Sequence, residues 1–170
     1  MKLNLPNYNP NKVFELYETL GYSLWMIQSL ELALSHYLVL AHKISSATAI
    51  SQVQQIFEQT SKKTFGFLLN DLKKSNDFLS EIIIKKLADI LENRNWLVHK
   101  VYAINQSDMF SKSKSDKLIS KIRTIGDDAI ELSKLISRKT DEVTTKKGFY
   151  TIEELDRKTQ EILNSWAKDN

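Results

Sequence analysis

The stretch of sequence that decides the fold is LGYSLWMIQSLELALSHYLVL, residues 20–40. At about 100° per residue, its apolar side chains fall on more than one side of a helix. A helix that is apolar nearly all round either lies in the centre of a protein or faces a second chain. Its one acid, Glu31, needs a partner if it is buried. We expect Arg94, or a lysine on a neighbouring helix, to form a structural ion pair with it.

The sequence on either side of this stretch also favours helices. Both prolines lie within the first ten residues, and the whole chain has only four glycines. Because few residues interrupt a helix, the chain is expected to form one helix after another. We predict a first helix that is capped by Asn9 or Asn11 and ends near Ile44. Three more helices are predicted at 49–61, 65–74 and 78–103.

The second half of the chain predicts one long helix and an appendage. A polar loop is expected at 105–115, followed by a helix at 116–138. Its apolar residues step by four and three, which makes a narrow heptad seam of Leu118, Ile122, Ile125, Ala129, Leu132 and Ile136. A polar linker is expected at 139–148. Thr151 and Glu154 then form a capping box for a C-terminal helix with one apolar side, made of Ile152, Leu155, Ile162 and Trp166.

These patterns together predict an all-α protein. The expected architecture is an up-and-down helical bundle of four to five helices with an extra C-terminal helix. The bundle is assigned to residues 1–138. Residues 139–170 form the linker and last helix, either within the same domain or as a swapped appendage. A chain of 170 residues is long enough to bury a core without further support.

Composition narrows the classes of function. The chain has no cysteine, which excludes disulfides, cysteine-based zinc sites and thiol catalysis. Its three histidines have no carboxylates at matching spacing, so no metal or other cofactor is expected. No signal-peptide run is visible, and residues 22–44 are too polar to span a membrane without a partner for Glu31. We therefore expect a soluble cytoplasmic protein without a membrane partner, and its net charge of +3 does not by itself indicate a nucleic-acid binder.

A second informative stretch is ENRNWLVHKVY, residues 92–102. An arginine such as Arg94 holds a phosphate as a permanently charged fork, and a histidine such as His99 can move a proton near neutral pH. Together they are a minimal set for cutting RNA without a metal. The plainer interpretation is an exposed helix end with ordinary polar residues, because a histidine there suits the helix dipole.

The spacing within this motif constrains how it could work. Asn95 and His99 are about one turn apart and share a helix face. Arg94 and His99 differ by about 140° around the axis and about 7.5 Å along it, so they do not converge on a straight helix. The Arg94 side chain is long, and it could reach the histidine, in particular if the helix end is bent or unwound. Alternatively, two such helices packed about a two-fold axis would pool their side chains.

A further segment, TFGFLLNDLKK at residues 64–74, accompanies the motif. With this segment, and with Arg94, Asn95 and His99 near the end of a helix in a small all-α chain, the sequence resembles the HEPN superfamily (higher eukaryotes and prokaryotes nucleotide-binding). The segment at residues 64–74 also resembles a short helix in a group of bacterial HEPN-like proteins. The resemblance covers about residues 12–136.

The resemblance implies a helical bundle that dimerises with the motif helices of two chains at the interface. It also implies a metal-independent endoribonuclease of a toxin–antitoxin, phage-defence or RNA-processing system. The implied partners are RNA, a second copy of the chain, and an antitoxin or defence-system protein. In the family the arginine and histidine carry catalysis, which here means Arg94 and His99. Some members have a modifiable tyrosine two residues after the histidine, whereas Tyr102 here is three residues on.

The expected chemistry is transesterification, in which the 2′-hydroxyl of the RNA attacks the adjacent phosphorus. His99 would accept or donate the proton, and Arg94 would clamp the phosphate. Asn95 would hold His99 in place or hydrogen-bond the phosphate. Lys100 and Tyr102 are the expected RNA-binding residues, the tyrosine by stacking on a base.

Two other functions stay open at this point. The chain could be a non-catalytic HEPN dimer that binds nucleotide, RNA or a partner protein. It could also be a plain helical scaffold whose working surface is the heptad seam of residues 118–136. A basic cluster could guide RNA or simply be a solvated face, and it consists of Lys112, Lys114, Lys117, Lys121 and Arg123.

Overall fold

The computed structural model describes residues 9–75, 79–105, 107–108 and 111–149, together with 151, 153, 154, 157, 160, 161 and 164. Every regular element in these residues is helical, which confirms the all-α prediction. The elements in order are α1 (Pro10–Leu38), a π-helical turn η1 (Val39–Lys43), α2 (Ile50–Ser61), α3 (Phe65–Lys74), α4 (Glu81–His99), α5 (Val101–Asn105) and α6 (Lys112–Lys146).

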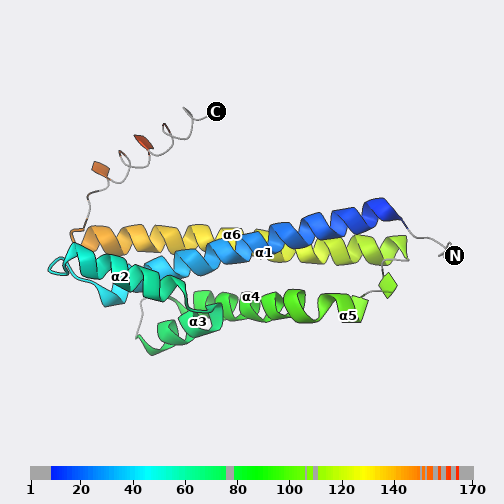
Figure 1. The fold of residues 1–170 in the computed structure, drawn as a ribbon, viewed down its shortest axis with the longest axis horizontal. Coiled ribbons are helices and arrows are strands. Elements are labelled where there is room, and N and C mark those ends of the chain that lie inside the picture. Colours follow the sequence, from blue (N-terminus) through cyan, green and yellow to red (C-terminus); the bar gives the residue numbers. More distant parts are fainter. Residues whose placement is uncertain are drawn as a thin grey trace.

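The two longest helices, α1 and α6, lie side by side and run in the same direction (Figure 1). Near their beginnings, Lys12 forms an ion pair of 2.6 Å with Asp116. Near their ends, the Lys147 Nζ donates to the Leu40 carbonyl at 3.0 Å. Helix α4 lies alongside this pair and runs antiparallel to both helices. Helices α2 and α3 lie at the end of the molecule where α1 ends (Figure 1). The three long helices therefore alternate in direction along the chain.

The heptad seam of α6 forms the centre of the core. All six predicted seam residues are buried, and they belong to the same cluster as the inner face of α1. That inner face includes Ile27, Leu30, Leu34 and Leu38. The seam is therefore filled by the chain's own first helix and is unavailable as the working surface of a scaffold, so that prediction is wrong.

Helices α1 and α6 approach closely where Ser23 meets Gly126. The Ser23 hydroxyl donates to the Ile122 carbonyl at 2.7 Å. A Cβ placed on Gly126 would lie 2.9 Å from the Ser23 Oγ and 3.0 Å from its Cα. Because real Cβ atoms do not approach this closely, the helix pair requires glycine at this position.

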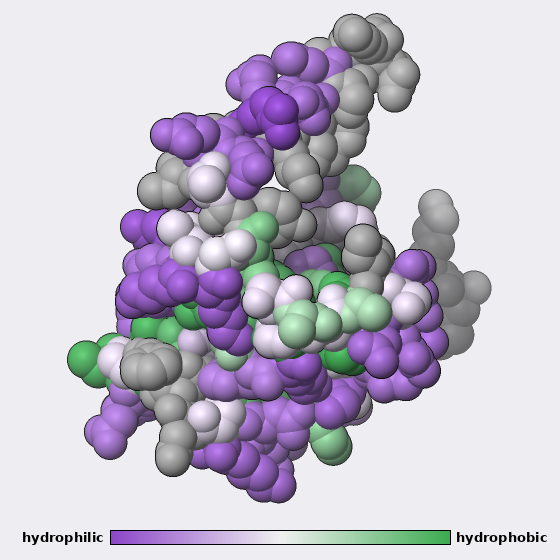
Figure 2. Space-filling model, turned by 90° about the vertical axis from the view of Figure 1, so that its left-hand side faces the viewer, coloured by the Kyte–Doolittle hydropathy of each residue, from purple (hydrophilic) through white to green (hydrophobic). Residues whose placement is uncertain are grey.

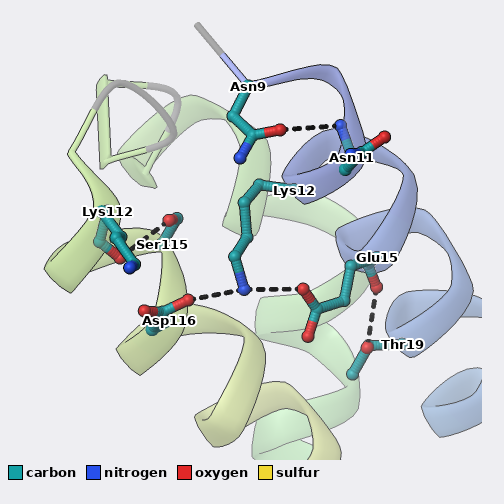
Figure 3. Close-up of polar contacts among 8 residues, drawn as sticks. All are labelled: Asn9, Asn11, Lys12, Glu15, Thr19, Lys112, Ser115 and Asp116. Carbon is teal, nitrogen blue, oxygen red and sulfur yellow. Dashed lines mark hydrogen bonds and ion pairs between the residues drawn. The ribbon is translucent and has the colours of Figure 1, made fainter. Parts of the chain in front are cut away.

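The first turn of α1 is capped by Asn9, one of the two predicted capping residues. The Asn9 side chain accepts from the Asn11 backbone N–H at 3.0 Å, so Asn9 is the cap (Figure 3). One turn on, Lys12 lies between Glu15 and Asp116 and so joins the starts of α1 and α6 (Figure 3).

The predicted polar linker at 139–148 is wrong over most of its length, because α6 continues to Lys146. Helix α6 also begins earlier than predicted, at Lys112, within the predicted loop at 105–115. Polarity alone does not end a helix, and here an ion pair between Lys139 and Glu142 at 2.8 Å supports the extra turns. The helix ends in a Schellman motif, in which Gly148 takes a φ of +68° and the Phe149 N–H donates to the Thr144 carbonyl.

Other boundaries lie close to prediction. Helices α2 and α3 match 49–61 and 65–74, whereas α4 ends at His99, four residues before the predicted end. The capping box after α6 is confirmed, since Thr151 and Glu154 exchange hydrogen bonds between side chain and backbone. The apolar positions predicted for the helix that follows, Ile152, Leu155, Ile162 and Trp166, lie outside the described residues.

Candidate nucleic-acid site at the end of α4

The core-facing side of α4 carries Arg94 among apolar residues. The residues at 83, 87, 90, 94, 97 and 101 step by four and three, and all but the arginine are buried hydrophobic side chains. Arg94 is half-buried at the edge of this seam. The spacing of four and three that predicts the α6 seam also places Arg94 on this seam of α4. Arg94 therefore leaves α4 on its core-facing side.

Arg94 lies within electrostatic reach of Glu31 on α1. Burial raises the pKa of the Glu31 carboxyl, and the Arg94 charge partly opposes that rise. The two groups do not form a direct ion pair within 4 Å. The expected ion pair of Glu31 with Arg94 is therefore not formed, and only a longer-range attraction joins the two groups between α1 and α4. Its effect is structural, because it reduces the cost of a half-buried acid.

The Arg94 side chain reaches from the seam toward Asn95. Its Nη1 donates to the Asn95 Oδ1 at 3.5 Å, a long hydrogen bond at an exposed position. Asn95 is exposed, and it lies about one turn before His99 on the same face of α4. The guanidinium therefore lies next to the face that presents the histidine.

His99 is the last residue of α4 and is exposed. Within the described part of the chain it has no hydrogen-bond or ion-pair partner. The helix is regular from Glu81 to His99, and the first residue to leave helical geometry is Lys100, with φ −125° and ψ −24°. The break therefore comes after the motif and does not bring Arg94 and His99 together. The helix end is therefore not unwound at His99, so the reach of the Arg94 side chain and a second chain are the arrangements that stay open.

The residues after the break extend the exposed surface. Lys100 is exposed, and α5 begins directly after it. Tyr102 on α5 is 77% exposed, and two apolar neighbours, Val98 and Ile104, are also exposed. A tyrosine ring this accessible is suited to stack on an unpaired base. Lys100 and Tyr102 are thus exposed side chains that follow His99 directly in the sequence.

The basic cluster on α6 is partly engaged within the protein. The Lys121 Nζ lies 4.0 Å above the centre of the Trp96 ring, which attaches α6 to the motif helix. Lys114 pairs with Asp108 at 3.5 Å. Trp96 is accordingly a packing residue between α4 and α6, and these two lysines have partners other than RNA.

A groove of about 460 Å³ lies between α4 and α6, and Asn93 is the part of the motif stretch that lines it. It is lined by Lys86, Asp89, Ile90, Asn93, Asp128, Glu131, Leu132, Leu135 and Arg138. Three acids face two cations there, so the groove does not attract a phosphate chain. The described residues contain no group of three histidines or acids that could hold a metal ion.

Comparison with known proteins finds no matching family model, no similar curated protein and no similar solved structure. The HEPN resemblance therefore rests on the motif residues and their placement.

Proposed function

We propose that this protein is a HEPN-type, metal-independent endoribonuclease whose active site is completed by a second copy of the chain. The observation that carries the proposal is the hydrogen bond from Arg94 to Asn95, the residue that shares an exposed helix face with His99. A phosphate-binding group and a proton-transfer group thus lie at one helix end. Because Arg94 and His99 leave the helix about 140° apart, we expect a complete site to combine Arg94 of one chain with His99 of the other.

In the proposed reaction, the RNA 2′-hydroxyl attacks the adjacent phosphorus as its proton passes to a histidine. The bond from phosphorus to the 5′-oxygen breaks, and that oxygen receives a proton. The products are a 2′,3′-cyclic phosphate and a 5′-hydroxyl end. Arg94 offsets the charge that develops on the phosphate oxygens, Asn95 positions His99 or the phosphate, and proton transfer by His99 supplies about 10²–10⁴-fold in rate. Lys100 and Tyr102 hold the flanking RNA.

The second candidate is a non-catalytic HEPN dimer that binds nucleotide, RNA or a partner protein. It is favoured by the position of Arg94 on the core seam beside Glu31, where the arginine has a structural role that needs no substrate. A cytoplasmic setting, and an antitoxin or defence-system partner, belong to both candidates as proposals.

The deciding experiment is incubation of the purified protein with mixed RNA in the presence of EDTA. We expect cleavage that leaves cyclic phosphate ends, no cleavage of the matching DNA, and loss of activity in His99→Ala. Lys85→Ala, an exposed change on the same helix, serves as the matched control and should retain activity. Equal cleavage by wild type and His99→Ala would overturn the proposal. RNA binding without cleavage by any variant would favour the second candidate.

A further inference from the structure

The outer face of α1 is an exposed apolar stripe. Residues 14, 17, 21, 25, 28 and 32 step by three or four and lie within about 60° of one direction around the helix. Four of them, Phe14, Tyr17, Trp25 and Leu32, are large hydrophobic residues that are 50–67% exposed. Buried residues such as Ser23 and Leu30 lie on the opposite side of the helix. The core therefore accounts for one side of this apolar helix and leaves the other uncovered.

Gly21 lies in the middle of this stripe, and no contact in the described part of the chain requires a glycine there. A Cβ added to Gly21 would meet nothing within 4 Å, in contrast to Gly126. An exposed glycine inside a helix costs about 1 kcal/mol relative to alanine. A flat position between Tyr17 and Trp25 is what the close approach of another helix requires.

The stripe is complementary to its own reversed copy. If two α1 helices pack antiparallel with residue 23 opposite residue 23, each residue faces the one for which the two numbers sum to 46. Trp25 then covers Gly21 of the second copy, and Phe14 meets its Leu32. Glu18, the one charged residue at the edge of the stripe, faces Gln28 and not a like charge.

We propose that this stripe is a self-docking surface, in which α1 packs antiparallel against α1 of a second copy about a two-fold axis near residue 23. The four large side chains alone offer roughly 500 Å² of surface. With the intervening positions, the face approaches the about 800 Å² per partner that a standard interface buries. In an antiparallel pair the two helix dipoles also point in opposite directions, which is electrostatically favourable.

A membrane is the competing occupant of this face. The helical segment Pro10–Lys43 is long and apolar enough by composition to cross a bilayer, a property that the core helix of a soluble protein shares. Its inner side is buried against α6, and the end of the molecule near α2 presents mostly hydrophilic residues (Figure 2). The pairing of Trp25 with Gly21 across a two-fold axis favours a second copy, because a bilayer gives no reason for a glycine there.

The pairing would also affect the proposed active site, a consequence that rests on the proposed function. The two-fold axis runs perpendicular to both helices and to the line between them, so each flank of α1 meets the same flank of its copy. Since α4 packs on one flank of α1, both motif helices would lie on the same side of the dimer. The interface itself does not depend on RNA cleavage, and its test does not use it.

Sedimentation of the full chain tests whether the stripe associates. We expect a dimer for wild type, and a monomer with unchanged helicity for Trp25→Glu. Ile82→Glu alters an equally exposed residue on α4 and should leave the dimer intact. Gly21→Leu, which meets open space within one chain, should weaken the dimer at least tenfold while the monomer stays folded. A monomeric wild type at every soluble concentration would overturn the proposal.

Cross-linking tests the antiparallel register, because the chain has no cysteine of its own. A mixture of Phe14→Cys and Leu32→Cys chains, one of them tagged, should form a disulfide between the two kinds of chain on oxidation. Phe14→Cys alone should not, since its two copies would lie about 27 Å apart. A disulfide in Phe14→Cys alone indicates a parallel pair and overturns the proposal. So does a monomer that binds phosphatidylcholine–phosphatidylserine vesicles and loses that binding in Trp25→Glu.

Discussion

Arg94 and His99 lie five residues apart on one regular helix, so their side chains leave α4 about 140° apart. Arg94 starts from the core seam and reaches Asn95, whereas His99 is exposed at the helix end. The helix does not unwind until Lys100. A reaction that uses both groups at one phosphate therefore depends either on the reach of the Arg94 side chain or on a group from another chain, and we expect the second chain.

Complementation between inactive variants tests whether Arg94 and His99 of one site come from different chains. Arg94→Ala and His99→Ala should each be inactive, and an equal mixture that is unfolded and refolded together should regain about a quarter of the wild-type cleavage rate. Half of the dimers are then mixed, and each mixed dimer holds one complete site out of two. The measurement is the rate of RNA cleavage in EDTA. No recovery in mixtures shown to contain mixed dimers would contradict a shared site.

The Glu31 and Arg94 pair predicts a pH-dependent change in stability. Burial raises the Glu31 pKa above its ordinary value of 4.5. A carboxyl whose pKa is higher in the folded protein than in the unfolded chain lowers the free energy of unfolding as pH rises through these two pKa values. The Arg94 charge reduces that loss. Arg94→Met should therefore lower the free energy of unfolding by about 1 kcal/mol at neutral pH, a value discounted for partial exposure. Below the unfolded pKa the loss should be smaller.

The control for this prediction is Glu31→Gln, in which the charge that Arg94 opposes is gone. Adding Arg94→Met to that variant should produce no pH-dependent loss, and denaturant titrations of all four proteins give the coupling free energy. A loss from Arg94→Met that is equal at both pH values would show that Arg94 acts through packing alone.

Two glycine substitutions should change stability in opposite directions. Gly126→Ala places a Cβ 2.8–3.0 Å from Tyr22 and Ser23, so it should lower the free energy of unfolding by about 1–3 kcal/mol. Gly66→Ala meets only the end of the Leu91 side chain at 3.7 Å and should raise stability by up to about 1 kcal/mol. Thermal unfolding of both variants checks this, and stabilisation by Gly126→Ala would contradict the close contact of α1 and α6.

Lys147 joins the end of α6 to the end of the first helix. Its Nζ donates to the carbonyls of Leu40, Ala41 and Ile44 at 3.0, 2.7 and 3.2 Å. Lys147→Met should lower the free energy of unfolding by about 1–2 kcal/mol, because these carbonyls lose a charged donor. Amide exchange of the Ile44 N–H, which bonds to Val39, should become faster. Lys146→Met, at an exposed neighbour, should change neither quantity.

The sequence predicted the parts of the fold that depend on local spacing. The α6 seam, the α3 boundaries and the caps at Asn9 and Thr151 follow from periodicity and from side chains near the backbone in sequence. The predicted end of α6 at residue 138 is wrong, and one of the contacts that hold the later turns joins Lys147 to residues more than 100 positions earlier. A contact of that kind leaves no local pattern.

The same division applies to the candidate site. The residues of the motif, and the angle between Arg94 and His99, follow from the sequence alone, because helix geometry relates side chains by their spacing. Only the tertiary structure decided that Arg94 faces Glu31 across the core seam and that the break falls at Lys100. The sequence likewise determined that α1 is apolar nearly all round. Which side is core and which is the exposed stripe of Trp25 was decided by the packing of α6, since a single helix does not specify its neighbours.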